Sequence, residues 1–243
     1  MEKSYVKSVE GRWGTCHYFD QDEYIGKSIL NYGEYNPDET EFIIGLAARA
    51  GKDKLVLDIG ANIGAIAQAL AFSGFTVEAF EPQPEVFEVL QQNFKGRAHN
   101  VALGDKTGMT QMPKLVYSER NNFGGISCNT ISKAHGGIPV KVEKLDDYKF
   151  DNVGLMKIDV EGYEELVLRG AVETINRCNP ILYLEDDRKE KSESLHAFLK
   201  SLGYVWEPHN PPLYRAKNFF GKGENIWGKN FVSKNIVCYR QRG

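Results

Sequence analysis

The chain has 243 residues, of which 42% are hydrophobic and 26% charged, an ordinary composition for a globular protein. This length allows one large domain or two small ones with a sizeable core, and the composition excludes a fibrous or disordered chain. Thirty basic and thirty-three acidic residues leave a net charge of −3, so no global positive field draws the chain to nucleic acid or anionic lipid.

One stretch, residues 59–77, contains no charged residue and approaches the length of a membrane-spanning helix. Its three glycines and its polar residues Asn62 and Gln68 make it too polar for lipid, and Asp58 and Glu78 flank it directly. The first residues (MEKSY) lack the apolar segment of a secretory signal. We therefore expect a soluble, cytoplasmic protein without a membrane partner.

The cysteines are scattered and show neither a C-x-x-C pair nor a histidine at zinc-ligand spacing. This pattern predicts free thiols, mostly buried, rather than a zinc site or a disulfide framework. The four residues are Cys16, Cys128, Cys178 and Cys238.

From Lys54 onward, strand-like apolar runs alternate with amphipathic helix-like runs, which is typical of an α/β fold with a parallel sheet covered by helices. The expected strands are residues 55–59, 76–80, 98–103, 154–160, 181–184 and 235–239. The expected helices are residues 63–71, 86–94, 164–175 and 195–202, each with apolar residues on one face.

Two regions depart from this alternation. Residues 106–142 are rich in Gly, Asn and Ser, and we expect hairpins and a long loop inserted there. Residues 1–50 are expected to be an N-terminal extension packed on the core, which leaves residues 51–243 as the main domain.

The most informative segment runs from Asp58 to Gly64 (DIGANIG) between an expected strand and an expected helix. Glycines there allow a tight turn and a close approach of a ligand to the main chain. Glu81 ends the next strand, where a carboxylate can accept hydrogen bonds from ribose hydroxyls. Because Asp58 would repel the pyrophosphate of a dinucleotide, the charges favour S-adenosylmethionine, which has a ribose and positive groups but no phosphate, over NAD.

Further motifs strengthen this interpretation. Together with Glu81-Pro82 and the glycine segment, they resemble the FkbM-type family of S-adenosylmethionine-dependent methyltransferases over about residues 32–185. The motifs are residues 32–34 (YGE), 100–105 (NVALGD) and 157–164 (KIDVEGYE). The resemblance implies a Rossmann-like class I methyltransferase fold with helices on both faces of a mostly parallel seven-stranded sheet. Residues 235–239 would form its antiparallel last strand.

The resemblance also implies a cofactor, S-adenosyl-L-methionine, and the residues that bind it. Glu34 would close over the cofactor. Apart from the resemblance, the position of Asp159 at the end of an expected strand also suits it to position the cofactor or the acceptor. The methionine moiety would lie near Gly60, Ala61, Asn62 and Gly64, with its ammonium group at Asp58. The ribose hydroxyls would lie at Glu81, and the adenine near Val101 and Ala102.

Methyl transfer requires alignment of the acceptor and exclusion of water, and a hydroxyl acceptor benefits from a base. Asp159 and Glu161 end an expected strand, and side chains two apart on extended chain point to the same side. We therefore predict Asp159 as the positioning carboxylate and base, with Glu161 as the second candidate. The alternative for Glu161 is that it caps the following helix.

The carboxylates at the ends of the expected strands have a rival use as oxygen ligands for a cation such as magnesium. Nothing in their spacing demands a metal, and we predict none. These residues are Asp159, Glu161, Glu185, Asp186 and Asp187.

Residues 203–243 contain seven Lys and Arg against two Glu, and the lysines alternate with aromatic residues such as Phe219, Trp227 and Phe231. Such a pattern can bind nucleic acid, but aromatic residues near a final strand are usually core. We predict an enzyme that methylates a hydroxyl on a small molecule or sugar. The alternatives are methylation of nucleic acid or protein, and a non-catalytic module that retains the cofactor pocket; the oligomeric state stays open.

Overall fold

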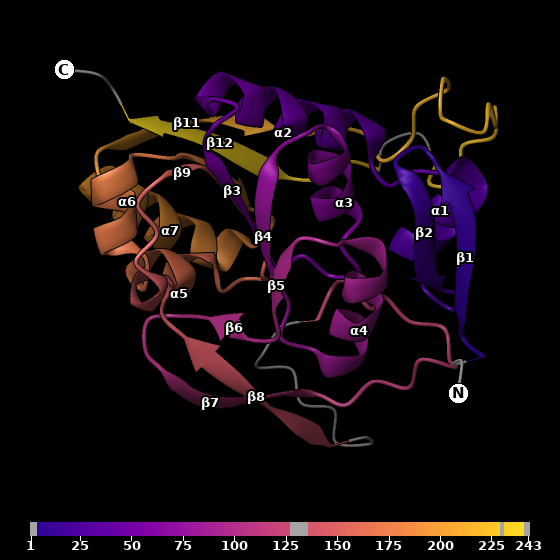
Figure 1. Ribbon diagram of the computed structural model, residues 1–243, viewed down its shortest axis with the longest axis horizontal. Helices are drawn as coiled ribbons and strands as arrows, with labels where there is room; N and C mark the ends of the chain where they lie inside the picture. The colour runs from indigo at the N-terminus through magenta and orange to yellow at the C-terminus, as the bar shows by residue number, and fades with distance from the viewer. Residues whose placement is uncertain (1–3, 127–135, 229–230, 241–243) are drawn as a thin grey trace.

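A seven-stranded sheet forms the centre of the computed structural model, which describes residues 4–126, 136–228 and 231–240 (Figure 1). The strand order is β11-β12-β10-β9-β3-β4-β5, and β12 runs antiparallel to both neighbours while the other pairs are parallel. This arrangement confirms the predicted sheet and its antiparallel last strand. The strands are β3 (Leu55–Ile59), β4 (Thr76–Phe80), β5 (Arg97–His99), β9 (Val153–Ile158), β10 (Ile181–Glu185), β11 (Tyr204–His209) and β12 (Asn235–Arg240).

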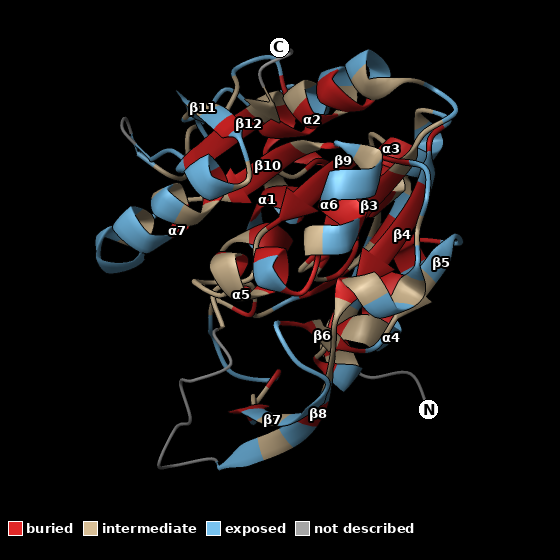
Figure 2. Ribbon diagram, turned by 90° about the vertical axis from the view of Figure 1, so that its left-hand side faces the viewer, coloured by how far each residue is buried: buried red, intermediate tan, exposed pale blue. Residues whose placement is uncertain are grey.

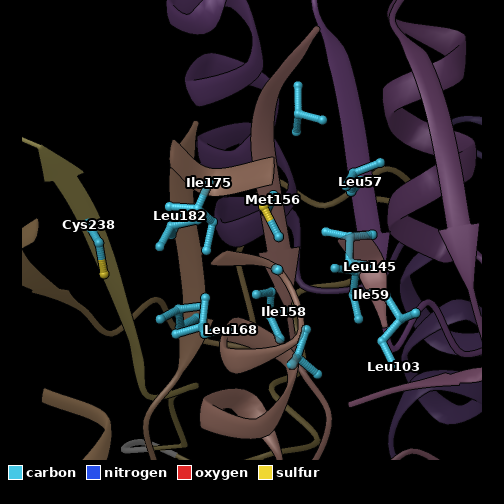
Figure 3. Packing of buried hydrophobic residues seen from close by; sticks show 14 of the residues in the cluster. Leu57, Ile59, Leu103, Leu145, Met156, Ile158, Leu168, Ile175, Leu182 and Cys238 are labelled. Carbon is cyan, nitrogen blue, oxygen red and sulfur yellow. The ribbon is translucent and has the colours of Figure 1, made fainter. Parts of the chain in front are cut away.

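Helices cover both faces of the sheet because successive strand residues point to opposite sides. In β9, Leu155 packs with Ile43 and Leu70, from helices of one face. Met156 belongs to the cluster on the other face (Figure 3), which includes Leu168. The first face carries α2 (Pro37–Ala50), α3 (Ala65–Phe72) and α4 (Pro84–Asn93), and the second carries α5 (Glu164–Arg169), α6 (Val172–Cys178) and α7 (Lys189–Ser201).

The burial pattern agrees with this three-layer arrangement. Figure 2 shows the central strands buried, while α2, α6 and α7 turn exposed faces outward. The charge-free stretch of residues 59–77 contains the end of β3, a loop, α3 and the start of β4, so its lack of charge reflects packing. In the part of the chain that the structure describes, no helix combines the length and hydrophobicity that crossing a membrane requires.

The first described residues form a β-hairpin, β1 (Val6–Gly11) and β2 (Gly14–Phe19), followed by α1 (Ile25–Tyr32). Phe19 and Ile29 pack with Val86 of α4 in a third apolar cluster. The hairpin therefore lies against the helices of the central sheet. The division into an extension of residues 1–50 and a core of residues 51–243 stays a prediction.

The single strand expected at residues 98–103 was wrong, because the chain turns there. β5 joins the central sheet, whereas β6 (Ala102–Leu103) pairs with β8 (Gly137–Glu143) in a separate sheet that includes β7 (Gly108–Pro113). The side-chain amide of Asn100 donates to the carbonyls of Glu81 and Pro82 at 2.9 and 3.0 Å, which holds the turn.

The helix expected at residues 164–175 is divided into α5 and α6 at Gly170. A Cβ at Gly170 would lie 1.9 Å from the carbonyl oxygen of Gly104, so the two backbones meet there. Asp146, in the short helix η1 (Leu145–Tyr148), accepts the N–H groups of Glu173 and Thr174 and so starts α6. This contact comes from outside the helix, and local periodicity does not reveal it.

The strand β11 was not predicted, because Pro208 interrupts its sequence. Proline is tolerated on an edge strand, and β11 lies at one edge of the sheet. Among the described cysteines, Cys16 and Cys238 are buried and Cys178 is partly buried, and all three are free thiols as predicted. Cys128 lies outside the described residues.

Candidate active site

A cavity of about 500 Å³ lies at the carboxyl ends of β3, β4, β9 and β10. Open α/β sheets bind ligands at these ends, and the volume is within the roughly 300–1,000 Å³ typical of small-molecule sites. Of the predicted site residues, the cavity is lined by Gly60, Ala61, Asn62, Glu81, Val101, Ala102, Asp159 and Glu161. The structure therefore brings most of the predicted residues together.

The glycine loop passes so close to the end of β9 that only glycine fits at position 60. Gly60 has a φ of +76°, and a Cβ there would lie 1.8 Å from the carbonyl oxygen of Asp159. The N–H groups of Gly60 and Ala61 both donate to the carbonyl of Phe80, each at 3.0 Å. These contacts tie the loop to both neighbouring strands and leave its backbone at the cavity wall.

Glu81 is buried at the cavity, where backbone groups hold its carboxylate. One oxygen accepts the N–H of Asn62 at 3.0 Å and the other accepts the N–H of Gln83 at 2.8 Å. Burial raises the pKa of Glu81 to about 7, although the two N–H groups act in the opposite direction. Each oxygen keeps a lone pair for a further donor, as two adjacent ligand hydroxyls would provide.

Lys157 lies at the centre of a buried charge network that sequence reasoning missed. Its Nζ is 3.2 Å from Oδ1 of Asp58 and 3.4 Å from Oδ2 of Asp159, and it donates to the carbonyl of Gly60 at 3.1 Å. Burial alone would lower the pKa of Lys157, but the surrounding carboxylates raise it above its usual value. A lysine in the otherwise apolar run VGLMKI was the available signal, because a buried charge needs a partner.

Three carboxylates, from Asp159, Glu161 and Glu185, gather with oxygen atoms within 4.8 Å of one another. Burial, followed by the charge of Asp159, raises the pKa of Glu161 to about 7 and that of Glu185 to about 11. Of the other two residues considered as metal ligands, Asp187 lines the cavity, whereas Asp186 accepts hydrogen bonds from α7.

Glu161 does not cap the following helix, so that alternative was wrong. Its carboxylate forms an ion pair with Arg188, and its φ of +56° shows that the chain is no longer extended at this point. Glu164 instead accepts the N–H groups of Val160 and Gly162, at 3.1 and 3.0 Å. Asp159 and Glu161 thus both reach the cavity, although the strand ends before them, at Ile158.

Three of the predicted cofactor residues lie outside the cavity lining. Asp58 is fully buried beneath the loop with Lys157, and Gly64 precedes α3, where a Cβ would meet Leu90 at 2.4 Å. Glu34 pairs with Arg12 at 3.0 Å and accepts the N–H of Phe219 at 2.8 Å. Their roles at the cofactor stay predictions.

Glu39 was also missed, together with other lining residues from both ends of the chain. It is buried on α2, and burial, followed by the charge of Asp159, raises its pKa to about 7. Glu39 precedes Ile43 and Leu46 at helical spacing, so its place on the apolar face was a readable signal. The remaining missed residues include Tyr24, Tyr35, Leu213, Phe231, Ser233 and Asn235.

Two aromatic residues near the C-terminus pack against Tyr24, although the Phe231 side chain stays partly exposed. The Trp227 ring stacks on those of Tyr24 and Phe231, with centroid distances of 5.6 and 5.7 Å. Two of these aromatic residues, Tyr24 and Phe231, line the cavity.

The sheet order, the antiparallel last strand and the position of the cavity define the Rossmann-like fold of class I methyltransferases. Residues 58–206 match the family model described as the methyltransferase FkbM domain. The match covers more than half of the chain, and the chain therefore belongs to the FkbM methyltransferase family.

Curated relatives are about a quarter identical to this chain over the aligned residues. It is 26% identical over 148 residues to hexuronic acid methyltransferase AglP of Haloferax volcanii, covering 59% of this chain and 61% of the relative. It is 28% identical over 181 residues to 31-O-demethyl-FK506 methyltransferase FkbM of Streptomyces tacrolimicus, covering 60% of this chain and 69% of the relative. The match to the first relative thus spans about three fifths of its length.

A solved structure has a similar fold. Methyltransferase FkbM from Methylobacillus flagellatus KT superposes with a TM-score of 0.52 at 18% identity. The superposition covers 77% of this chain and 44% of that chain. At this identity the likeness concerns the fold.

Proposed function

We propose that this protein is an S-adenosylmethionine-dependent O-methyltransferase that acts on a hydroxyl of a sugar or another small molecule. The observation that carries the proposal is the buried Glu81 carboxylate, held by two N–H groups beside the glycine loop at the cavity wall. Membership of the FkbM family supports methyl transfer. The names of the curated relatives supply a hexuronic acid and 31-O-demethyl-FK506 as examples of acceptors.

The lining residues fit the cofactor. Glu81 would accept hydrogen bonds from the ribose hydroxyls, and the backbone at Gly60 to Asn62 would lie along the methionine moiety. Val101 and Ala102 would lie near the adenine. Asp58 would act through Lys157, because Asp58 itself is buried behind the loop.

When bound, S-adenosylmethionine supplies an electrophilic methyl group on a sulfonium. In the proposed reaction the methyl group would pass to the acceptor oxygen, the electron pair of the carbon–sulfur bond would stay on sulfur, and the acceptor would lose its hydroxyl proton. Asp159 accepts the hydroxyl proton, and Lys157, whose Nζ is 3.4 Å from Oδ2 of Asp159, holds that carboxylate in position. Glu161, paired with Arg188, helps to orient the acceptor.

The proposal includes no metal. Burial, followed by the charge of Asp159, raises the pKa of Glu185 to about 11, and a proton on Glu185 would relieve the charge repulsion among Asp159, Glu161 and Glu185. Lys157 and Arg188 balance the other two carboxylates.

Calorimetry with S-adenosylmethionine, S-adenosylhomocysteine and NAD tests the cofactor. We expect both adenosyl compounds to bind and NAD not to bind, and binding of NAD alone would refute the proposal. Transfer of a labelled methyl group to sugars and other hydroxyl compounds then tests the reaction. Transfer only to RNA, DNA or protein would favour that alternative, and tight cofactor binding without any transfer would favour a non-catalytic module.

A further inference from the structure

The cavity has an aromatic wall made by residues from the two ends of the chain. Tyr24 and Phe231 line the cavity with ring centroids 5.7 Å apart. Trp227 stacks on both of them, with interplanar angles of 10° and 22°, and Lys27 lies over the Trp227 ring at 5.3 Å. The Trp227 ring therefore supports the two lining rings, which add aromatic surface to the cavity wall.

The cavity is also rich in carboxylates. Its described lining includes three basic residues: Lys157, Arg188 and Lys234. It also includes six acidic residues: Glu39, Glu81, Asp159, Glu161, Glu185 and Asp187. Lys157 and Arg188 already form ion pairs with lining carboxylates, and Lys234 is exposed. Within this described lining, no buried cation is left over for an anionic acceptor.

We propose that the acceptor is the uncharged, polyhydroxylated ring of a glycoside. The C–H face of the ring would lie on Tyr24 and Phe231, and its hydroxyls would donate to Asp159, Glu161 and Glu185. This inference rests on the proposed function and narrows its acceptor.

A phenol suits the cavity less well. It brings one or two hydroxyl donors and two apolar faces, so most of the gathered carboxylate oxygens would lose water without gaining a donor. The carboxyl oxygen Oε2 of Glu185 is already buried without a hydrogen-bond partner among the described residues. A sugar ring carries several hydroxyls at close spacing and can satisfy such oxygens together.

A uronic acid also suits the cavity less well, although the name of one relative refers to a hexuronic acid. Its carboxylate would enter beside Asp159 and Glu161, whose partners Lys157 and Arg188 are already engaged. The further basic residue of the described lining, Lys234, is exposed and offers a cation at the solvent side of the cavity. Like charges placed side by side repel strongly in a partly buried site. We therefore expect the cavity to bind a uronic acid more weakly than the matching neutral sugar.

Saturation-transfer NMR on the protein saturated with S-adenosylhomocysteine tests the inference, in buffer with EDTA so that no cation bridges the carboxylates. The probes are methyl glycosides of glucose, galactose, mannose and rhamnose, the matched glucuronide and galacturonide, and catechol. We expect at least one neutral glycoside to bind. Its matched uronide, where one exists, should bind with about tenfold lower affinity, and catechol should bind more weakly than that glycoside. Binding of no glycoside, or equal or tighter binding of a uronide or of catechol, would overturn the inference.

Substitutions locate the binding. Phe231→Ala should weaken binding of the preferred glycoside about tenfold while the Kd for S-adenosylhomocysteine is unchanged. Phe231→Leu keeps an apolar side chain but loses the flat ring, and it should weaken glycoside binding as well. This second variant guards against misfolding as the cause of the weaker binding. The matched control is Phe219→Ala, since Phe219 is 51% exposed and does not line the cavity. Unchanged glycoside binding in both Phe231 variants would refute the aromatic wall, whereas a wild-type protein that fails to bind S-adenosylhomocysteine would refute the proposed function instead.

Discussion

The Glu81 carboxylate is buried and still has oxygen lone pairs that can accept hydrogen bonds from a ligand. The carboxylate has left water, yet it accepts only two backbone N–H groups, from Asn62 and Gln83. Burial raises its pKa to about 7, so the site loses negative charge on the acidic side of neutrality. A ligand with two adjacent hydroxyls would complete its hydrogen bonding.

Glu81→Ala should weaken binding of S-adenosylmethionine by about 1.5–3 kcal/mol, because charged hydrogen bonds to the ribose are lost. This corresponds to roughly a 10- to 150-fold rise in Kd, measurable by calorimetry. Glu78→Gln is the matched control, since Glu78 is a buried carboxylate of the same strand that pairs with Arg97 and His99 instead. An unchanged Kd for Glu81→Ala would remove Glu81 from the ribose site.

Asp159→Asn should fold and bind S-adenosylmethionine but lose methyl transfer by a factor on the order of 10²–10⁴, because the amide cannot take the hydroxyl proton. Single-turnover rates with a labelled methyl group measure the chemical step. Glu161→Gln should lose less, because Glu161 is committed to Arg188. A wild-type rate for Asp159→Asn would exclude Asp159 as the base.

At the scale of elements, the loop between β3 and α3 depends on the end of β9. Its position is set by the close contact of Gly60 with Asp159, and by Lys157, which reaches both the loop and Asp58. The glycine segment alone predicts the loop. The partner strand that restrains it is more than 90 residues further along the chain, and only the sheet register brings Asp58 opposite Lys157.

Gly60→Ala should lower the free energy of unfolding by more than about 2 kcal/mol and abolish cofactor binding, because the Cβ would displace the loop from β9. Gly45→Ala is the matched control: it lies on an exposed position of α2 with no atom within 4 Å of a Cβ. It should stabilise the protein by about 0.5–1 kcal/mol. Urea denaturation measures both, and equal effects of the two substitutions would contradict the proposed crowding at the loop.

Other elements show why the sequence predicted strands better than their ends. Short apolar runs predicted β3, β4, β9, β10 and β12, because a strand that is buried on both faces is apolar at successive positions. The turn at Asn100 and the break at Gly170 depend on hydrogen bonds and close contacts with distant segments. Such contacts leave no periodic signal, so one strand was predicted too long and one helix was predicted unbroken.

At the scale of the whole molecule, the cavity is completed by the two ends of the chain. Figure 1 shows the N-terminal hairpin and α1 beside the loop that precedes β12. The hydroxyl of Tyr32 donates to the carbonyl of Glu224 and accepts the N–H of Ile226, each at 2.9 Å. These contacts place Tyr24 against Trp227 and Phe231, so the aromatic wall is a product of the overall fold.

The unfolding free energy of the ligand-free protein should fall as pH rises from about 4.5 to 7. Burial raises the pKa of Asp22 to about 6, and that of Glu39, Glu81 and Glu161 to about 7. In this interval the folded state therefore holds protons that the unfolded state has released, and each added pH unit favours unfolding.

Urea midpoints between pH 4.5 and 7.5 measure this slope. Glu39→Gln should reduce it, while the control Glu193→Gln, at an exposed position, should leave it as in the wild type. A urea midpoint that rises with pH between 4.5 and 7.5 would show that these carboxyl groups are ionised in the folded protein.

By itself, the sequence determined the α/β fold, the strand–loop–helix unit around Gly60 and the carboxylate at the end of β4. These features are local: apolar periodicity, glycine conformation and a charge at a strand end are all encoded by near neighbours. The tertiary structure alone decided that Lys157 joins Asp58 to Asp159, that Glu39 and Glu185 face the same cavity, and that Glu34 lies away from it. Those outcomes depend on packing between distant segments, because a charge leaves water only where the fold brings it a partner.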